Sequence, residues 1–314
     1  MSKSNVVKPL TGFRKYISIK VKHFIDGYGI ILSKRFPSTY RMLQVFTFGT
    51  KNFSSDVLKY MKVSKDLAFN RPISDISYRE IDLYMQTPKD LRKMIPFLLI
   101  SSVPFAQYVT IPIAFWFPRQ FLSSHYWSIE QRNRFAIQDH TKKLYYYRPV
   151  FRHLQKRLSM IKSESGKCLK AFSKLGSGTH PTVPEILELS PFFENEPYHL
   201  DSLSHTHLIG LCKIHGVNLL PGKKIRLKNH IYFIKELDNA WMRESNDDKN
   251  LEDYKKACFQ RGLNPVNLSR DEMLQWLESW IRISQMTHEG NLSLLLHAPI
   301  FLAYNHPSNW RLIH

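Results

Sequence analysis

The chain has 314 residues, of which 43% are hydrophobic and 13% aromatic, a composition that suits a folded protein and excludes an extended disordered one. Its net charge of +19 is concentrated: residues 1–60 hold 11 Lys and Arg against 2 Asp and Glu, and residues 119–178 hold 13 against 3. Such segments suit contact with anionic lipid or nucleic-acid phosphates, although solvated helix faces are the simpler interpretation. The three cysteines are widely spaced and odd in number, which argues against a disulfide framework and indicates a reducing compartment.

The N-terminal part reads as a basic arm followed by helices. Residues 1–39 carry no acid before Asp26, a bias typical of an organellar targeting segment. Apolar residues at helical spacing from Tyr40 to Met61 predict a helix, and Ser77 with Glu80 makes a capping box that begins the next. We assign residues 40–94 as membrane-proximal helices.

Residues 95–118 contain no charged side chain. As one helix they would be about 36 Å long, enough to cross a hydrocarbon core of about 30 Å. Arg92, Lys93 and Arg119 flank the run, so we predict a single kinked transmembrane helix. The residues that define this span are Ile95, Pro96, Pro104, Gln107, Pro112, Trp116 and Pro118.

Two alternatives to a single span stay open. Prolines remove backbone donors and break helices, so the segment could instead form a buried helical hairpin or a re-entrant segment. Gln107 is expected to hydrogen-bond a neighbouring helix or a freed carbonyl rather than to serve an ion path, because the segment has no ionisable residue. Lys and Arg are nearly balanced on the two sides, so charge does not choose an orientation.

Residues 119–178 form a basic juxtamembrane region. Ser128 with Gln131 makes a capping box, and amphipathic basic helices with a bend at Pro149 are expected to follow. This region and the basic turn near residue 223 supply the predicted contact surface for ribosomal phosphates or anionic lipid. Its members are Arg132, Arg134, Lys142, Lys143, Arg152, Lys156, Arg157, Lys223, Lys224, Arg226 and Lys228.

Residues 179–314 are predicted to be a helical domain that begins after Gly176-Ser177-Gly178. Capping boxes and glycine stops indicate its helices, and the run 291–304 is expected to be the closing core helix. The boxes are Thr182 with Glu185 and Ser269 with Glu272, and the stops are Gly216 and Gly262. No useful run alternates with the period of a strand, so the fold class is all-α.

No pattern of catalytic residues appears, and we predict neither an enzyme nor a cofactor or metal site. His205 and His207 would face different sides of a helix, with no further ligand at metal-binding spacing. The Gly222-Lys223-Lys224 turn lacks the preceding glycine of a phosphate-binding loop.

Several motifs resemble the LETM family of mitochondrial inner-membrane proteins, and the resemblance covers about residues 40–304. They are Val103-Pro104-Phe105, Phe117-Pro118, Leu211-Cys212-Lys213, Ala257-Cys258 with Arg261-Gly262-Leu263, and Trp276-Leu277. We take Cys258, Arg261, Gly262 and Trp276 as the family motif. The chain is most similar to short family members that lack a coiled coil and an EF-hand.

The resemblance implies one membrane span followed by a 14-3-3-like, ribosome-binding helical domain that faces the matrix. It implies a role in holding mitochondrial ribosomes or their products near the inner membrane, and in respiratory function. The alternatives are K⁺/H⁺ or Ca²⁺/H⁺ exchange by an oligomer, and a structural role in binding anionic lipid such as cardiolipin. Two departures bear on these functions. Gln107 stands where long members carry a glutamate, and Gly222-Lys223-Lys224 stands where they carry Gly-Thr-Asn.

Overall fold

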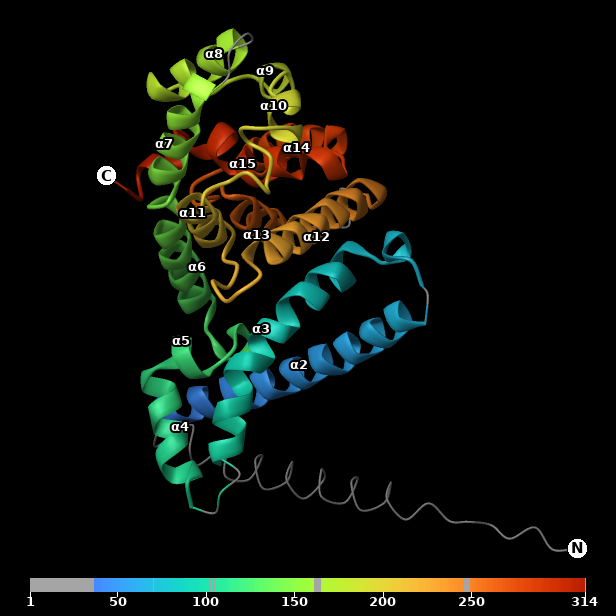
Figure 1. Ribbon diagram of the computed structural model, residues 1–314. Coiled ribbons are helices and arrows are strands. Elements are labelled where there is room, and N and C mark those ends of the chain that lie inside the picture. The colour runs from blue at the N-terminus through green and yellow to red at the C-terminus, as the bar shows by residue number, and fades with distance from the viewer. Residues whose placement is uncertain are drawn as a thin grey trace, which may run out of the picture. The chain divides into compact units, whose positions relative to one another are not determined.

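Figure 1 shows the computed structural model of the chain. The structure describes residues 37–69, 71–101, 103, 105–160, 165–245 and 249–313, so most of the predicted N-terminal arm lies outside it. Every regular element within these ranges is an α-helix or a 3₁₀ helix, which confirms the all-α prediction for the described residues.

Five α-helices come first in the described chain, and the last of them lies in the basic region. They are α2 (Pro37–Ala68), α3 (Tyr78–Ser101), α4 (Gln107–Trp116), α5 (Pro118–Phe121) and α6 (Ile129–Leu144), with short 3₁₀ turns at Ile73–Asp75 and Ser124–Tyr126. The helix predicted from Tyr40 is therefore longer at both ends. The predicted box at the start of α3 is present, because the backbone N–H of Ser77 donates to the Glu80 carboxylate at 3.1 Å.

The remaining helices follow in short steps. They are α7 (Tyr147–Arg157), α8 (Ser165–Gly176), α9 (Val183–Leu187), α10 (Ser190–Glu194), α11 (His205–His215), α12 (Lys223–Arg243), α13 (Leu251–Arg261), α14 (Arg270–Met286), α15 (Leu292–Ala303) and α16 (Pro307–Trp310). The boxes predicted before α9 and α14 both form, and Gly216 and Gly262 adopt the left-handed conformation that ends α11 and α13.

The chain divides into two compact units, and α2 and α3 each contribute to both. Unit 1 comprises Met1–Leu58 and Asp90–Ile129, and unit 2 comprises Lys59–Lys89 and Glu130–His314. The described part of unit 1 has a small core in which Phe53 of α2, Met94 and Phe97 of α3, and Tyr126 are buried. His125 adds a polar contact to this core, with Nε2 at 2.9 Å from the Asp56 carboxylate.

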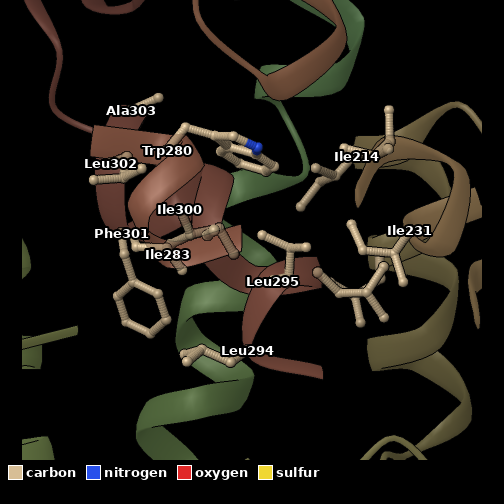
Figure 2. Close-up of a cluster of buried hydrophobic side chains, with 14 of the residues drawn as sticks. Ile214, Ile231, Trp280, Ile283, Leu294, Leu295, Ile300, Phe301, Leu302 and Ala303 are labelled. Atoms are coloured by element: carbon tan, nitrogen blue, oxygen red, sulfur yellow. The ribbon is translucent and has the colours of Figure 1, made fainter. Parts of the chain in front are cut away.

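Unit 2 is built around α15, the predicted closing helix. All residues of α15 are buried, and α10, α11, α12 and α14 pack against it. Figure 2 shows Leu295 of this helix on the side that faces Ile214 of α11 and Ile231 of α12, whereas the ring of Phe301 points to a different side. A helix that is apolar on every side is stable in water only when neighbours surround it, so α15 organises this core.

Candidate functional surfaces

The apolar segment 95–118 forms a helical hairpin, so the predicted single continuous helix is wrong. α3 ends at Ser101, the backbone of Phe105 has a positive φ of 65°, and α4 begins at Gln107. Figure 1 shows α4 running back beside the last turns of α3. Among the described residues, no helix combines the length and the apolar character needed to span a bilayer.

The inner face of the hairpin is packed. Met94 and Phe97 of α3 are buried with Ala114 of α4, and the hydroxyls of Ser101 and Thr110 lie 3.0 Å apart across the two arms. In an apolar setting this bond satisfies two groups that would otherwise cost free energy. The two arms therefore form one element.

The outer face of the hairpin is apolar and exposed. Phe105 at the turn is 79% exposed and Trp116 near the end of α4 is 77% exposed. Other large apolar side chains exposed on this element are Ile95, Leu98, Leu99, Ile100, Val103, Val109 and Phe117. Large apolar side chains exposed together on one element mark a site of contact with a membrane or with another protein.

The residues predicted to define the span are distributed over this hairpin. Ile95 and Pro96 lie exposed on α3, Pro112 lies exposed within α4, and Pro118 begins α5. Pro104 lies outside the described residues, and the structure places Gln107 at the start of α4 without describing its side chain.

The predicted basic residues belong to unit 2. Helix α7 shows most clearly how apolar and basic side chains lie on opposite faces of one helix. Tyr147, Val150, Phe151 and Leu154 form its buried stripe. Arg152 and Lys156 point away from this stripe and are exposed. Arg134, Lys142 and Lys228 are also exposed, on α6 and α12. Figure 1 shows α6 and α7 following one another along one side of this unit.

Four predicted contact residues instead hold the loop 197–205 and the turn before α12. Arg157 donates to the carbonyls of Pro197 and Ser202 at 2.5 and 2.7 Å, and Lys224 donates to that of Asp201 at 2.7 Å. Lys223 Nζ lies 3.3 Å from a ring nitrogen of His205. Arg226 donates to the carbonyl of Leu220 at 2.6 Å. These cations have structural partners that the sequence did not indicate.

Arg132 and Lys143 line a cavity between α3, α6 and α13, within unit 2. Lys89, Lys255 and Lys256 line it with them, although sequence reasoning did not single these three lysines out. They come from helices far apart in the chain, so only the tertiary structure brings them together. Burial and the charge of Lys89 lower the pKa of Lys143 to about 8.

The family motif forms part of the core of unit 2. Arg261 is 1% exposed, and its Nε and Nη2 donate to one carboxylate oxygen of Asp238 at 2.9 and 2.7 Å. Trp280 donates to the other oxygen at 3.0 Å. The charge of Asp238 raises the pKa of Arg261 even though burial acts in the opposite direction. Asp238, which sequence reasoning missed, is therefore the partner that explains the motif arginine.

The other motif residues also serve packing. Gly262 has a φ of 101°, and its carbonyl accepts a hydrogen bond from the Tyr147 hydroxyl at 3.0 Å. Trp276 donates to the Leu302 carbonyl at 3.2 Å. Burial raises the pKa of the Cys258 thiol to about 12, which leaves it protonated and unreactive at neutral pH.

Buried histidines are a further feature that the sequence did not reveal. His207 and His297 share a hydrogen bond of 2.8 Å between their Nε2 atoms, and His215 Nε2 lies 2.8 Å from the Leu296 carbonyl oxygen. Burial is the largest cause of their lowered pKa, about 2 for His207 and about 4 for His215 and His297. His205, by contrast, meets Lys223 outside this cluster. Within the described residues, no group of three or more metal-ligating side chains converges.

Comparison with known proteins places these features in a family. The family model described as LETM1-like, RBD matches residues 76–301. The chain is 29% identical to human LETM1 domain-containing protein 1, over 93% of this chain and 82% of the relative. It is 22% identical to LETM1 domain-containing protein mdm28, mitochondrial, of Schizosaccharomyces pombe, over 84% of this chain and 57% of the relative.

A longer relative from Drosophila melanogaster is named mitochondrial proton/calcium exchanger protein. The chain is 26% identical to it over 67% of this chain and 21% of the relative. Because the family model covers more than half of the sequence and includes the Asp238–Arg261 pair, the chain belongs to the LETM1-like, RBD family.

Proposed function

We propose that this chain is a non-enzymatic mitochondrial protein that attaches to a membrane through its apolar hairpin and holds mitochondrial ribosomes or their products near that membrane. The mitochondrial setting follows from the printed names of the relatives from Drosophila and fission yeast. The inner membrane, with unit 2 in the matrix, is the location that fits this role.

The exposed hairpin supports the membrane part of the proposal. α4 has 10 residues and is about 15 Å long, about half the thickness of a hydrocarbon core. A hairpin of this depth would bury the exposed side chains of Ile100, Phe105 and Val109 in lipid while both of its ends stay near the head groups. The basic residues Arg92 and Arg119 flank it, where they suit anionic phosphates such as those of cardiolipin.

The family match and the basic face of α7 support the ribosome part. The matched family is one of ribosome-binding domains, and Arg152 and Lys156 stand exposed on the side of α7 opposite its buried stripe. Ribosomal RNA presents a dense array of phosphates, which exposed cations bind with a strong dependence on salt. The exposed basic face of α7 is the single observation that carries this part.

Proton-coupled cation exchange is the second candidate, because the relative from Drosophila is named as an exchanger. Residues 95–118 contain no Asp, Glu, Lys, Arg or His, whereas ion paths through membranes ordinarily use one. Cation flux in proteoliposomes that a Gln107→Ala substitution abolishes would favour exchange over ribosome binding.

One flotation experiment tests the two parts of the main proposal separately. Full-length protein is mixed with liposomes that contain anionic lipid, mitochondrial ribosomes are added, and the mixture is floated at low and high salt. The wild-type chain should float with the liposomes and carry ribosomes with it, and high salt should release the ribosomes. Ile100→Asp with Val109→Asp should leave the protein at the bottom, since a carboxylate in hydrocarbon costs about 3 kcal/mol.

Charge reversal on α7 provides the second arm. Arg152→Glu with Lys156→Glu should float with the liposomes but lose the ribosomes, because the substitutions leave the hairpin unchanged. Arg282→Glu, an exposed charge reversal on α14, is the matched control and should keep both activities. Equal ribosome recovery with the α7 variant and the control, or recovery that does not depend on salt, would contradict the proposal.

A further inference from the structure

Three consecutive tyrosines join α6 to α7 within unit 2, and each has a different setting. Tyr147 is 1% exposed, and its hydroxyl donates to the Gly262 carbonyl. Tyr146 is half-buried, with Lys213 Nζ 6.0 Å from the centre of its ring. Tyr145 is 63% exposed, and its side chain has no hydrogen bond or ring contact with any described residue. Packing within unit 2 therefore accounts for two of these tyrosines but not for Tyr145.

The connection that holds Tyr145 keeps the helical direction of side chains. Pro149 has no N–H to donate to the Tyr145 carbonyl, which explains why α6 ends just before Tyr145. The backbone nevertheless stays close to helical: the N–H of Tyr146 donates to the Lys143 carbonyl at 3.0 Å, and that of Val150 to the Tyr146 carbonyl at 3.1 Å. Residues three or four apart across the connection therefore still share a face.

Four cations share the exposed face with Tyr145. They follow one another at steps of three or four residues when Tyr145 is counted between the first and the second, and each is exposed. They are Lys142, Arg148, Arg152 and Lys156. None of their side chains has a hydrogen bond or an ion pair with a described residue. Residues 140–163 contain no Asp or Glu. These four cations and Tyr145, which we call the α6–α7 stripe, therefore form an unneutralised surface about 21 Å long.

The composition of the α6–α7 stripe favours RNA over a membrane surface. Helices that lie on a membrane expose several large apolar side chains. Among residues 130–159, all of which the structure describes, Tyr145 is the one large apolar side chain that is exposed. A single aromatic ring between cations instead matches a nucleic acid, whose phosphates bind the cations and whose bases stack on the ring. Neighbouring base pairs cover the base faces in a duplex, so such stacking requires an unpaired base.

We propose that the α6–α7 stripe binds unpaired segments of RNA, with one base stacked on Tyr145 and the phosphates on either side of it held by the four cations. Lys142 lies before the stacked base, and Arg148 lies after it at the same spacing. Duplex RNA would meet the cations alone. This inference rests on the ribosome part of the proposed function, because it specifies which part of ribosomal RNA the basic face binds.

Fluorescence anisotropy with full-length protein in neutral detergent micelles tests the proposal. The probes are a short single-stranded RNA, the same strand with its bases removed, and the matching duplex. The wild type should bind the intact single strand more tightly than the abasic strand, which carries the same phosphates. Tyr145→Ala should weaken binding of the intact single strand at least about fivefold, the loss expected for one stacked base, and leave binding of the other two probes unchanged.

Three more variants separate stacking from charge. Tyr145→Phe keeps the ring and should bind the intact strand as the wild type does. Arg148→Gln should weaken binding of all three probes and reduce the salt dependence, because it removes a phosphate contact. Tyr232→Ala is the matched control and should bind as the wild type does. Tyr232 is 43% exposed on α12, where Glu236 and Glu289 lie close enough to raise its pKa and would repel phosphates.

The same proteins in the flotation experiment separate this inference from the proposed function. A wild-type chain that carries ribosomes but binds intact and abasic strands equally would overturn the inference and leave the ribosome function standing. Loss of flotation with anionic liposomes in Tyr145→Ala, without loss of RNA binding, would also overturn it and identify the α6–α7 stripe as a membrane surface. Single-strand binding that depends on Tyr145, in a protein that carries no ribosomes, would support the stacking and contradict the ribosome function alone.

Discussion

At the scale of single residues, unit 2 depends on buried polar groups that are matched to one another. Asp238 accepts from Arg261 through one oxygen and from Trp280 through the other, so one carboxylate satisfies two helices at once. Bringing a charge out of water costs several kcal/mol, and the pair is tolerated because each partner compensates the other. Removing one partner alone should therefore lower the free energy of unfolding far more than removing both.

We expect Asp238→Ala to lower the free energy of unfolding by about 3–5 kcal/mol, because it leaves the Arg261 charge and the Trp280 N–H buried without their acceptor. The double variant Asp238→Leu with Arg261→Met should lose less than Asp238→Ala alone. Chemical denaturation followed by circular dichroism measures both. Asp271→Ala, at an exposed position on α14, should change stability by less than about 1 kcal/mol. Equal losses at Asp238 and Asp271 would show that the ion pair is not important for stability.

The buried histidines predict a loss of stability in mild acid. His140, His215 and His297 have a pKa lowered to about 4, whereas each titrates near 6.5 in the unfolded chain. The unfolded state thus binds more protons between these values, and stability is full above about pH 6.5 and falls as pH drops toward 4. Each histidine contributes a slope of up to about 1.4 kcal/mol per pH unit in this window.

Denaturation at pH 7.5, 6.0 and 5.0 should show this decline, and His297→Gln should reduce its slope. Glu185 and Glu272 also have a lowered pKa, but their effect begins only below the ordinary carboxylate value of about 4.3. Measurements at pH 5 and above therefore report the histidines. A stability that stays constant from pH 7.5 to 5.0 would contradict the burial of neutral histidines.

At the scale of elements, helix ends were predictable because their signals are local. Thr182 with Glu185 and Ser269 with Glu272 begin helices as predicted, and Gly262 ends one. The turn of the hairpin was not predictable in this way, because Phe105 adopts a positive φ that its residue type does not indicate. Hydropathy identifies an uncharged segment, but it does not show whether the segment continues as one helix or folds back as a hairpin.

Replacing Gly262, which ends α13, with alanine should lower stability more than the same change at a glycine of similar backbone conformation elsewhere. A Cβ on Gly262 would lie 2.3 Å from the Tyr147 hydroxyl and 2.9 Å from Pro299, and the backbone φ of 101° is strained for alanine. Gly222 has a similar φ of 84° but open space around it. Gly222→Ala should cost about 1 kcal/mol from strain alone, and Gly262→Ala several kcal/mol more. Similar melting temperatures for the two variants would refute this reasoning.

At the scale of the whole molecule, the sequence showed which segments are basic or apolar but not which distant segments pack together. The positive charge of α6 was visible in the sequence. The sequence did not show that Lys142 is exposed while its neighbour Lys143 lines a cavity with residues of α3 and α13. Likewise Asp238 and Arg261 lie 23 residues apart, and no local pattern joins them. Relations between distant segments therefore required the structure.

The hairpin also changes how the whole chain should meet a membrane. A single span would place the residues before it and after it on opposite sides of the bilayer. A hairpin returns the chain to the side from which it entered, so Ser54 of α2 and Gln120 of α5 should share one side. Both positions are exposed in unit 1 and accept a cysteine.

Labelling with a membrane-impermeant maleimide distinguishes the two arrangements. In sealed liposomes, Ser54→Cys and Gln120→Cys should react from the same side, while Ile100→Cys at the hairpin should react only after detergent is added. Cys168, Cys212 and Cys258 are buried and burial raises the pKa of each thiol, so the wild-type chain provides the low background that this assay needs. Labelling of Ser54→Cys and Gln120→Cys from opposite sides would show that the segment spans the bilayer and that the hairpin does not persist in lipid.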